Sequence, residues 1–280
     1  ERLESQDLIR THIFPEGDSD QIYLPESGPP RSAQTNGTTE SALKDVLVLE
    51  LGDEGTQYSG KLLAEMGARV IKIEPPQGAN CRHRGPFKDD TPDPNGSVYF
   101  WAYNTSKESL VLDLTTEADQ ARLRTLANKA DILLEDFSPG YLASLGLGHS
   151  DLSKENPGLI TVSVTSFGQT GPMKDWKGND LVHWAMGGNM WLVGYDDAGT
   201  TPICPQGDHS YIIGGHWATI GAMAALEDRD GKGTGQHVDV SIHEACSLCT
   251  QISVPIYEYT GEVIQRHDFL GGAVKCKDGR

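Results

Sequence analysis

The sequence is poor in basic residues and in long apolar runs, and each shortage excludes a class of protein. Its 280 residues include 23 Lys and Arg against 40 Asp and Glu, for a formal net charge of −17. A chain this acidic repels the phosphates of nucleic acids and of anionic membranes, although local basic groups still allow a pocket for a small anion. No run approaches the roughly 18 apolar residues of a membrane-spanning helix. We therefore expect neither nucleic acid nor a membrane as a partner.

Cysteine is also scarce. The five cysteines are odd in number and unevenly spaced, which argues against a disulfide framework and favours a reducing compartment, the cytoplasm. Three residues, His243, Cys246 and Cys249, form an H-x-x-C-x-x-C pattern. This pattern is compatible with a metal site, a redox pair or one packed face of a helix. A metal site needs further ligands, and none is near in sequence, so packing is favoured and no metal is expected.

Two common enzyme signatures are missing. The turn after the first predicted strand reads GDEG instead of G-x-G-x-x-G, and its Asp53 and Glu54 would repel a pyrophosphate. This argues against a nicotinamide-dependent dehydrogenase. The segment VTSFGQTG lacks the G-x-S-x-G of a serine hydrolase.

Apolar runs alternate with helical patterns from residue 46 onward. We predict strands at 46–51, 69–74, 110–114, 131–137, 159–167 and 237–242, and helices at 56–67, 116–129, 180–192, 211–227 and 243–257. This alternation indicates an α/β fold, a Rossmann-like open parallel sheet flanked by helices. Ligands of such sheets bind beyond the carboxyl ends of the strands, so the turns there are where a site is expected. Residues 1–43 are polar and rich in turn formers, which predicts a linker or extended arm, with 22–24 as a short docking strand.

One carboxylate stands out. Asp208 follows Gly207 and directly precedes a long apolar helical pattern. At the N-terminus of a helix, backbone N–H groups and the helix dipole stabilise an ionised carboxylate. The residue type and place fit either a simple helix cap or a reactive carboxylate, and the pattern alone favours the cap.

Five blocks, in their order and spacing, resemble the class III CoA-transferases, the group that contains formyl-CoA transferase, carnitine CoA-transferase and the α-methylacyl-CoA racemases. The blocks are LLAEMGARVIKIEPP (62–76), NTSKESLVLDL (104–114), KADILLEDFSPG (129–140), NPGLITVSVTSFGQTGP (156–172) and GDHSYIIGGHWATIGAMAALEDRDGKGTGQHVDVSIHEA (207–245). The resemblance covers about residues 44–280. It implies the family's large α/β domain at 44–265 and, at 266–280, the start of a linker or small domain that is otherwise missing. The chain is then expected to be a truncation, a cleavage product or half of a fusion, and to form an interlocked homodimer or pair with the other half.

The resemblance makes Asp208 the catalytic aspartate, with Gly207 beside it. It implies transfer of CoA from an acyl-CoA to a carboxylic acid through a covalent aspartyl intermediate, with CoA as a substrate and no tightly bound cofactor. The CoA-binding positions that it implies are Glu54, Gly55, Leu112, Asp113, Leu114, Thr115, Asp136, Phe137, Ser138, Lys177, Gly178, Asn179 and Asp180.

The sequence departs from the family pattern at several of these places. Asp136 stands where the family usually has Asn, and Pro75 stands where a basic residue is frequent. Other basic side chains are therefore expected to contact the CoA phosphates. The candidates are Lys72, Arg82, Arg84 and Lys177.

Two alternatives stay open. The racemase branch carries a His-Asp pair where this chain has Asn179 and Asp180. Racemisation needs a proton carrier on each face of the α-carbon, so Asn179 favours a transferase over a racemase or isomerase. The other alternative is a truncated domain that binds CoA without turnover.

Overall fold

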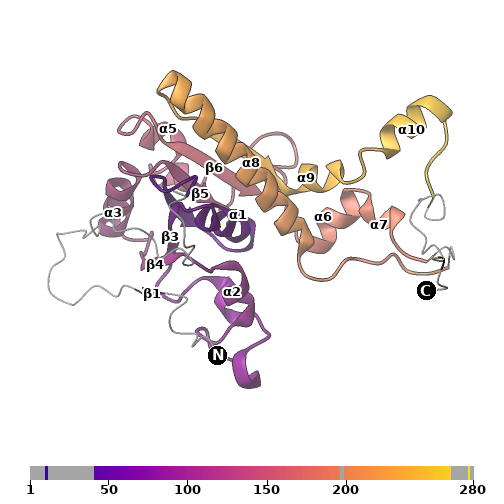
Figure 1. Ribbon diagram of the computed structural model, residues 1–280, viewed down its shortest axis with the longest axis horizontal. Coiled ribbons are helices and arrows are strands. Elements are labelled where there is room, and N and C mark those ends of the chain that lie inside the picture. Colours follow the sequence, from indigo (N-terminus) through magenta and orange to yellow (C-terminus); the bar gives the residue numbers. More distant parts are fainter. Residues whose placement is uncertain (1–9, 12–40, 196–198, 266–276, 278–280) are drawn as a thin grey trace.

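A seven-stranded, wholly parallel sheet forms the centre of the computed structural model, which describes residues 10–11, 41–195, 199–265 and 277 (Figure 1). The strand order is β1-β4-β3-β2-β5-β6-β7. The strands are β1 (Arg10–Thr11), β2 (Leu47–Leu51), β3 (Arg69–Glu74), β4 (Glu108–Val111), β5 (Ile132–Glu135), β6 (Ile160–Thr165) and β7 (His237–Ser241). Every neighbouring pair runs parallel, which confirms the predicted Rossmann-like sheet.

Helices connect these strands. They are α1 (Glu54–Glu65), α2 (Val98–Tyr103), α3 (Glu117–Ala127), α4 (Tyr141–Ser144), α5 (His149–Leu152), α6 (Asp180–Met186), α7 (Asn189–Leu192), α8 (His209–Lys232), α9 (Ile242–Leu248) and α10 (Ser253–Thr260), with short 3₁₀ helices at Asn80–His83 and Lys88–Asp90. Local signals set several ends. The Thr116 hydroxyl accepts from the N–H of Asp119 to start α3, and Gly233, at φ 77°, ends α8.

Most predicted boundaries differ from the structure by a few residues, and three of the predicted elements are shifted or divided. The strand expected at 110–114 lies at 108–111, so residues 112–115 form the turn after β4. The single helix expected at 180–192 is two helices, because Gly188 adopts a φ of 80° between α6 and α7. The helix expected at 243–257 is likewise divided into α9 and α10.

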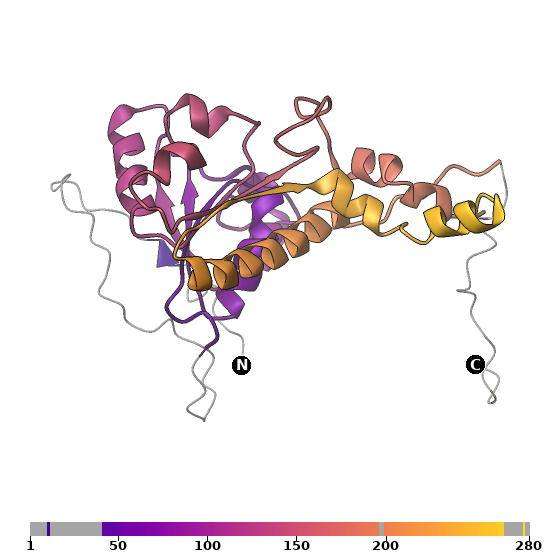
Figure 2. The ribbon, with the colours of Figure 1, turned by 90° about the horizontal axis from the view of Figure 1, so that it is seen from above.

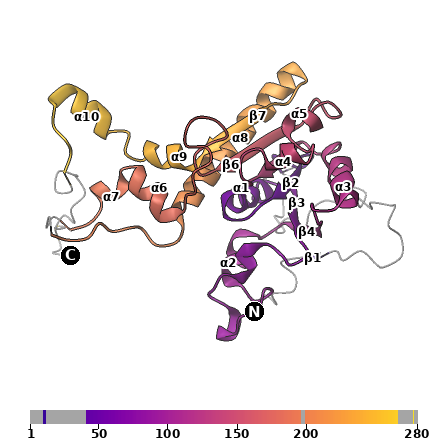
Figure 3. The ribbon, with the colours of Figure 1, turned by 180° about the vertical axis from the view of Figure 1, so that it is seen from behind.

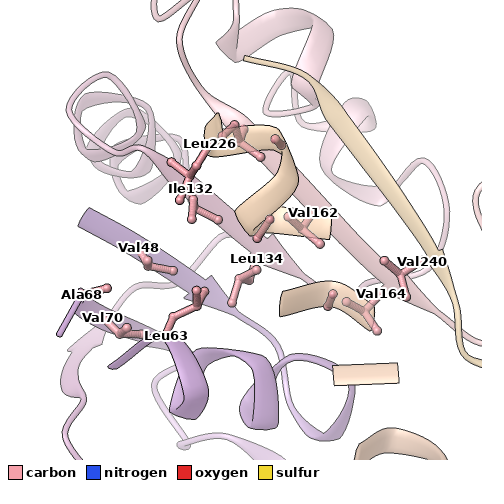
Figure 4. Close-up of a cluster of buried hydrophobic side chains, with 14 of the residues drawn as sticks. Val48, Leu63, Ala68, Val70, Ile132, Leu134, Val162, Val164, Leu226 and Val240 are labelled. Atoms are coloured by element: carbon pink, nitrogen blue, oxygen red, sulfur yellow. The ribbon is translucent and has the colours of Figure 1, made fainter. Parts of the chain in front are cut away.

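Each face of the sheet packs against its own layer of helices. On one face, Leu63 of α1 and Leu226 of α8 pack on Val48, Leu134 and Val162 of the strands (Figure 4). On the other face, α3, α4 and α5 cover a second apolar cluster. Figure 3 shows α1 and α3 on opposite sides of the strands. Burial on both faces explains why the strands read as continuous apolar runs instead of alternating ones.

Helices α6, α7, α9 and α10 form an arm that extends beyond the sheet from the first turns of α8 (Figures 1 and 2). The arm exposes large apolar side chains, including Ile252, Val254, Tyr257 and Tyr259. A cleft of about 340 Å³ on the arm is lined mainly by apolar residues, Trp191 among them.

The predicted outer segments fall mostly outside the described residues. Of the expected linker at 1–43, only 10–11 and 41–43 are described, and 10–11 pairs along β4 while Leu43 packs in the core. The proposed strand at 22–24 and, apart from residue 277, the segment 266–280 lie outside the described residues. No helix in the described part of the chain combines the length and apolarity needed to cross a membrane.

Three buried charges support the turn between β2 and α1. Glu50, fully buried, lies 2.7 Å from the ammonium groups of both Lys72 and Lys107. Lys72 also donates to the carbonyl of Gly52 at 2.8 Å, and Lys107 donates to the carbonyl of Gln57 at 2.8 Å. Burial by itself would raise the pKa of Glu50, but the two ammonium groups hold it below its usual value. Side chains from β2, from β3 and from the residue just before β4 thus fix the backbone at the beginning of α1.

We expect Glu50→Gln to lower the free energy of unfolding by about 3–5 kcal/mol, because two buried ammonium groups would be left without a counter-charge. Urea denaturation measures the loss. Lys154→Gln is the matched control: it breaks an exposed ion pair with Asp151 and should leave stability nearly unchanged. Equal losses in the two variants would contradict a structural role for Glu50.

Candidate active site

The candidate site lies next to β2, where the order of the strands changes direction. Strands β3 and β4 are added on one side of β2, and β5, β6 and β7 are added on the other. Strand β2 lies between β3 and β5, and a ligand crevice is expected at the carboxyl ends of β2 and β5. There the Asp136 carboxylate, just after β5, accepts from the N–H groups of Asp53 and Gly55, each at 2.9 Å. Gly52 has a φ of 142°, and a Cβ on it would lie 2.1 Å from an oxygen of Asp136. The turn is therefore closed tightly around this carboxyl group.

The tight turn alters the acidity of Asp136. Burial of its carboxyl group, followed by the nearby charge of Asp53, raises the pKa of Asp136 to about 7. The two N–H donors oppose that rise without cancelling it. At neutral pH, Asp136 is therefore close to its point of half-protonation.

Asp208 stands at the N-cap position of α8 but does not cap it. Its φ of 55° is left-handed, and its side chain makes no capping hydrogen bond. Instead, Asp180 Oδ1 accepts from the N–H of Ser210 at 2.9 Å and takes the capping role. The Asp208 carboxylate points to Arg84, whose Nη2 lies 2.6 Å from its Oδ2. The sequence pattern correctly places Asp208 at the start of the helix. The capping hydrogen bond that it favours for this side chain is wrong.

Arg84 connects Asp208 to the start of α1. Its Nη1 donates to Glu54 Oε1 and to the Tyr99 hydroxyl, both at 3.1 Å. Its guanidinium carbon lies 4.2 Å from the centre of the Tyr99 ring. Ser97 donates from its hydroxyl to the carbonyl of Arg84 at 2.6 Å, which fixes the backbone. Two carboxylates from distant parts of the chain therefore share one guanidinium.

These groups line a cleft of about 530 Å³. Its lining residues are Glu54, Arg84, Asn179, Asp180, Leu181, Cys204, Pro205, Gln206, Gly207, Asp208 and Tyr211. The side chain of Asp208 is only about one-fifth exposed, so its carboxylate faces a partly enclosed space.

The comparisons with known proteins agree with this architecture. The model of CoA-transferase family III matches residues 43–280. The chain belongs to this family.

Several curated relatives are named CoA-transferases. The BbsE subunit of succinyl-CoA:(R)-benzylsuccinate CoA-transferase of Thauera aromatica is 34% identical over 83% of this chain and 57% of its own length. Succinyl-CoA–D-citramalate CoA-transferase of Chloroflexus aurantiacus is 38% identical, over 80% and 55%. Acetyl-CoA:oxalate CoA-transferase of Acetobacter aceti is 37% identical, over 76% and 54%. The chain spans little more than half the length of these relatives.

Two solved structures show the same fold. A CAIB/BAIF family protein from Brucella suis superposes with a TM-score of 0.76 at 31% identity, covering 81% of this chain and 60% of that one. The protein Rv3272 from Mycobacterium tuberculosis gives a TM-score of 0.70 at 29% identity, over 80% and 61%.

Among the family positions predicted from sequence, Glu54, Asn179, Asp180, Gly207 and Asp208 meet in the cleft. Their assigned roles stay predictions. Asn179 caps α6, its side chain accepting from the N–H of Val182 at 3.0 Å. Gly55 and Asp136 do not line the cleft and belong to the turn already described.

Other predicted positions lie outside the cleft. The residues Leu112, Asp113, Leu114 and Thr115 follow β4, where Asp113 accepts from the N–H and the hydroxyl of Thr115. Phe137 packs on Tyr141, Ser138 and Lys177 are exposed, and Gly178 passes so close to His183 that a Cβ would lie 2.3 Å from the ring.

Two of the candidate phosphate ligands are wrong. Lys72 is 1% exposed in its ion pair with Glu50, and Arg82 is buried in an ion pair with Glu74. Neither cation is available to a CoA phosphate. Arg84 lies in the cleft, and Lys177 is exposed just before α6.

The thiol interpretations also change. Cys246 is completely buried in the core, and burial raises its pKa to about 12, which contradicts a redox pair with Cys249. Within the described residues, no group of three His, Cys, Asp or Glu side chains is placed to hold a metal.

The sequence did not single out Cys204, which lines the cleft with its sulfur 3.7 Å from Asp180 Oδ2. Its only sequence signal is its closeness to Asp208.

Asp136 makes the stability of the fold depend on pH. Because its folded pKa of about 7 exceeds the unfolded value near 4, the folded state holds the extra proton between these values. Stability should therefore fall as the pH rises from about 4 to 7. Asp136→Asn, the residue usual in the family, keeps an oxygen for both N–H donors and removes this titration. We expect the variant to be more stable by roughly 4 kcal/mol at pH 8 and equal to the parent near pH 4.

Urea denaturation at several pH values tests this expectation. Asp239→Asn is a control, since Asp239 also accepts backbone N–H bonds, from Gln169, in an exposed place. An identical pH slope in the parent and in Asp136→Asn would show that Asp136 is ionised in the folded state throughout.

Proposed function

We propose that this protein transfers CoA from an acyl-CoA donor to a carboxylic acid acceptor, through a covalent intermediate on Asp208. The observation that carries the proposal is the placement of the Asp208 carboxylate. It is released from capping, paired with Arg84 and directed into a cleft. A carboxylate in this position is suited to attack a thioester, which is uncharged at its reacting carbon.

The proposed reaction exchanges bonds of similar energy and needs no ATP. An oxygen of Asp208 attacks the acyl carbon, the C–S bond breaks with its electron pair leaving on sulfur, and an anhydride forms. The CoA thiolate then attacks Cγ of Asp208, which releases the donor acid as a carboxylate and leaves an aspartyl-CoA thioester. The acceptor carboxylate attacks the same Cγ and expels the thiolate, and the thiolate finally attacks the acceptor's acyl carbon. Asp208 is regenerated as a carboxylate.

The long CoA molecule is proposed to lie along the carboxyl edge of the sheet. Its thioester end would reach the cleft, where Glu54, Asn179 and Asp180 are exposed to it. Its remote end would reach the turns after β4 and β5, which hold the predicted positions 112–115 and 136–138. Of the two remaining candidates, Arg84 is paired with Asp208, so Lys177, exposed before α6, is the cation proposed for the phosphates. Gly178 lets this segment pass close to His183.

We propose a short, polar carboxylic acid as the acceptor. The cleft carries four ionisable carboxylate or guanidinium side chains, together with the amides of Asn179 and Gln206. Such a lining suits a small polar acid better than a long acyl chain. The relatives named for D-citramalate and oxalate support the same class, while the relative named for (R)-benzylsuccinate takes a larger acid.

The assembly proposed is an interlocked homodimer, or a pairing with the other half of a fusion, in the cytoplasm. The apolar side chains exposed on the arm support an interface there, since exposed apolar patches commonly mark contact surfaces. Two relatives are named as the alpha and beta subunits of succinyl-CoA–L-malate CoA-transferase.

A racemase is the less favoured alternative. Asn179 occupies the place where a proton carrier would be needed, and its side chain carbonyl is engaged in capping α6. An isomerase would exchange the α-proton of its acyl-CoA with deuterium from solvent without a second acid. A binding module would retain CoA without any covalent adduct.

We expect acyl-CoA alone to add the mass of CoA to the peptide that carries Asp208, and hydroxylamine to remove it. Asp208→Asn should abolish both the adduct and the exchange of CoA between two acids, while CoA still binds. Peptide mass spectrometry and a CoA-exchange assay measure the two effects. Glu262→Gln, an exposed carboxylate after α10, is the control and should retain both. An adduct that persists in Asp208→Asn would refute the assignment.

A further inference from the structure

The cleft holds more negative than positive charge. Its lining includes the carboxylates of Glu54, Asp180 and Asp208, and Arg84 is the one cation among the described residues that line it. The acids released and consumed by the proposed reaction are anions. They must enter a space whose fixed charges mostly repel them, so the single guanidinium is the charged group of the lining that attracts them.

Arg84 is anchored independently of Asp208. Its Nη1 is held by Glu54 and by the Tyr99 hydroxyl, its guanidinium carbon lies over the Tyr99 ring, and its backbone carbonyl is held by Ser97. Only Nη2 is directed to Asp208. A loss of charge at Asp208 would therefore leave the guanidinium in place with one nitrogen lacking its anionic partner.

Acylation of Asp208 produces that loss of charge. A carboxylate becomes a neutral anhydride or thioester, and Nη2 then faces the cleft without a counter-ion. A hydrogen bond from a guanidinium N–H to a carboxylate is charge-assisted and strong, so the released Nη2 is a site for an incoming acid. The other cations near the turn do not compete, because Lys72, Lys107 and Arg82 are all held in buried ion pairs.

We propose that Arg84 is the carboxylate-binding residue for the acid substrate: it pairs with Asp208 in the resting site and with the free acid while Asp208 carries CoA. This inference rests on the proposed function. In the step that it serves, a carboxylate oxygen of the acid bonds to Cγ of residue 208, and the C–S bond breaks with its electron pair leaving on sulfur. Arg84 forms no covalent bond and transfers no proton in this step. The same contact serves the donor acid as it leaves and the acceptor as it enters.

The first test measures binding without turnover, with succinate as the probe. Asp208→Asn removes the charge that occupies Arg84, so calorimetry should show succinate binding about 10- to 100-fold tighter than to the parent. The double variant Asp208→Asn/Arg84→Gln should lose this gain. Asp208→Asn/Lys154→Gln removes an exposed charge from the loop after α5 and should keep it. Equal affinity of Asp208→Asn and the Arg84 double variant, or no binding to either, would overturn the proposal.

The second test separates the acid from the acyl-CoA. Arg84→Gln should raise the KM for the acceptor acid about 10- to 100-fold, with a much smaller change in the rate at which acyl-CoA alone loads Asp208. Arg84→Lys keeps the positive charge but lacks the planar guanidinium donors. Its KM for the acceptor acid should lie between the values for the parent and for Arg84→Gln. If Arg84 only positions Asp208, the loading rate would fall and the KM for the acid would stay the same, which contradicts the proposal.

The two proposals fail in different ways. An absence of any adduct on Asp208 in the parent would refute covalent transfer. The succinate measurements need no adduct, so they judge the role of Arg84 in either case.

Discussion

The site depends on the hydrogen bond from the N–H of Ser210 to Asp180. The first N–H groups of a helix seek an acceptor, and the nearest carboxylate in sequence is Asp208. Because Asp180 supplies that acceptor at 2.9 Å, Asp208 is free to adopt its left-handed backbone and turn its side chain into the cleft. Such a conformation in a non-glycine residue costs about 1 kcal/mol or more and persists only where the surroundings impose it. Gly207, at φ 99°, makes the sharp approach possible.

A second set of contacts holds the opposite wall of the cleft. Lys72 binds the carbonyl of Gly52, while Asp136 binds the N–H groups of Asp53 and Gly55. The peptide groups of one turn are thus held from two sides by charged side chains from neighbouring strands. Glu54, between the held residues, has little freedom to move away from Arg84. The position of the guanidinium is therefore set by the sheet as well as by its own loop.

The sequence predicts the sheet because strands buried on both faces leave continuous apolar runs, and it predicts the place of Asp208 because a glycine precedes a long helical pattern. It misplaces β4, since Leu112 and Leu114 prolong the apolar run after pairing has ended. It also fails to reveal the pair of Arg84 and Asp208, which are 124 residues apart. Their contact results from how two loops meet at the edge of the sheet, and no local spacing encodes it.

The ion pair also gives an order to the reaction on the proposed mechanism. While Asp208 is ionised, Arg84 is occupied and the remaining carboxylates repel a free acid. An acyl-CoA meets no such obstacle at its reacting end, because a thioester is neutral. Only after Asp208 has become an anhydride or thioester does the cleft offer a guanidinium nitrogen, Nη2 of Arg84, that is free of its carboxylate partner. The electrostatics of three carboxylates and one arginine would thus exclude the acid before the acyl-CoA has reacted and attract it afterwards, without any movement of the backbone.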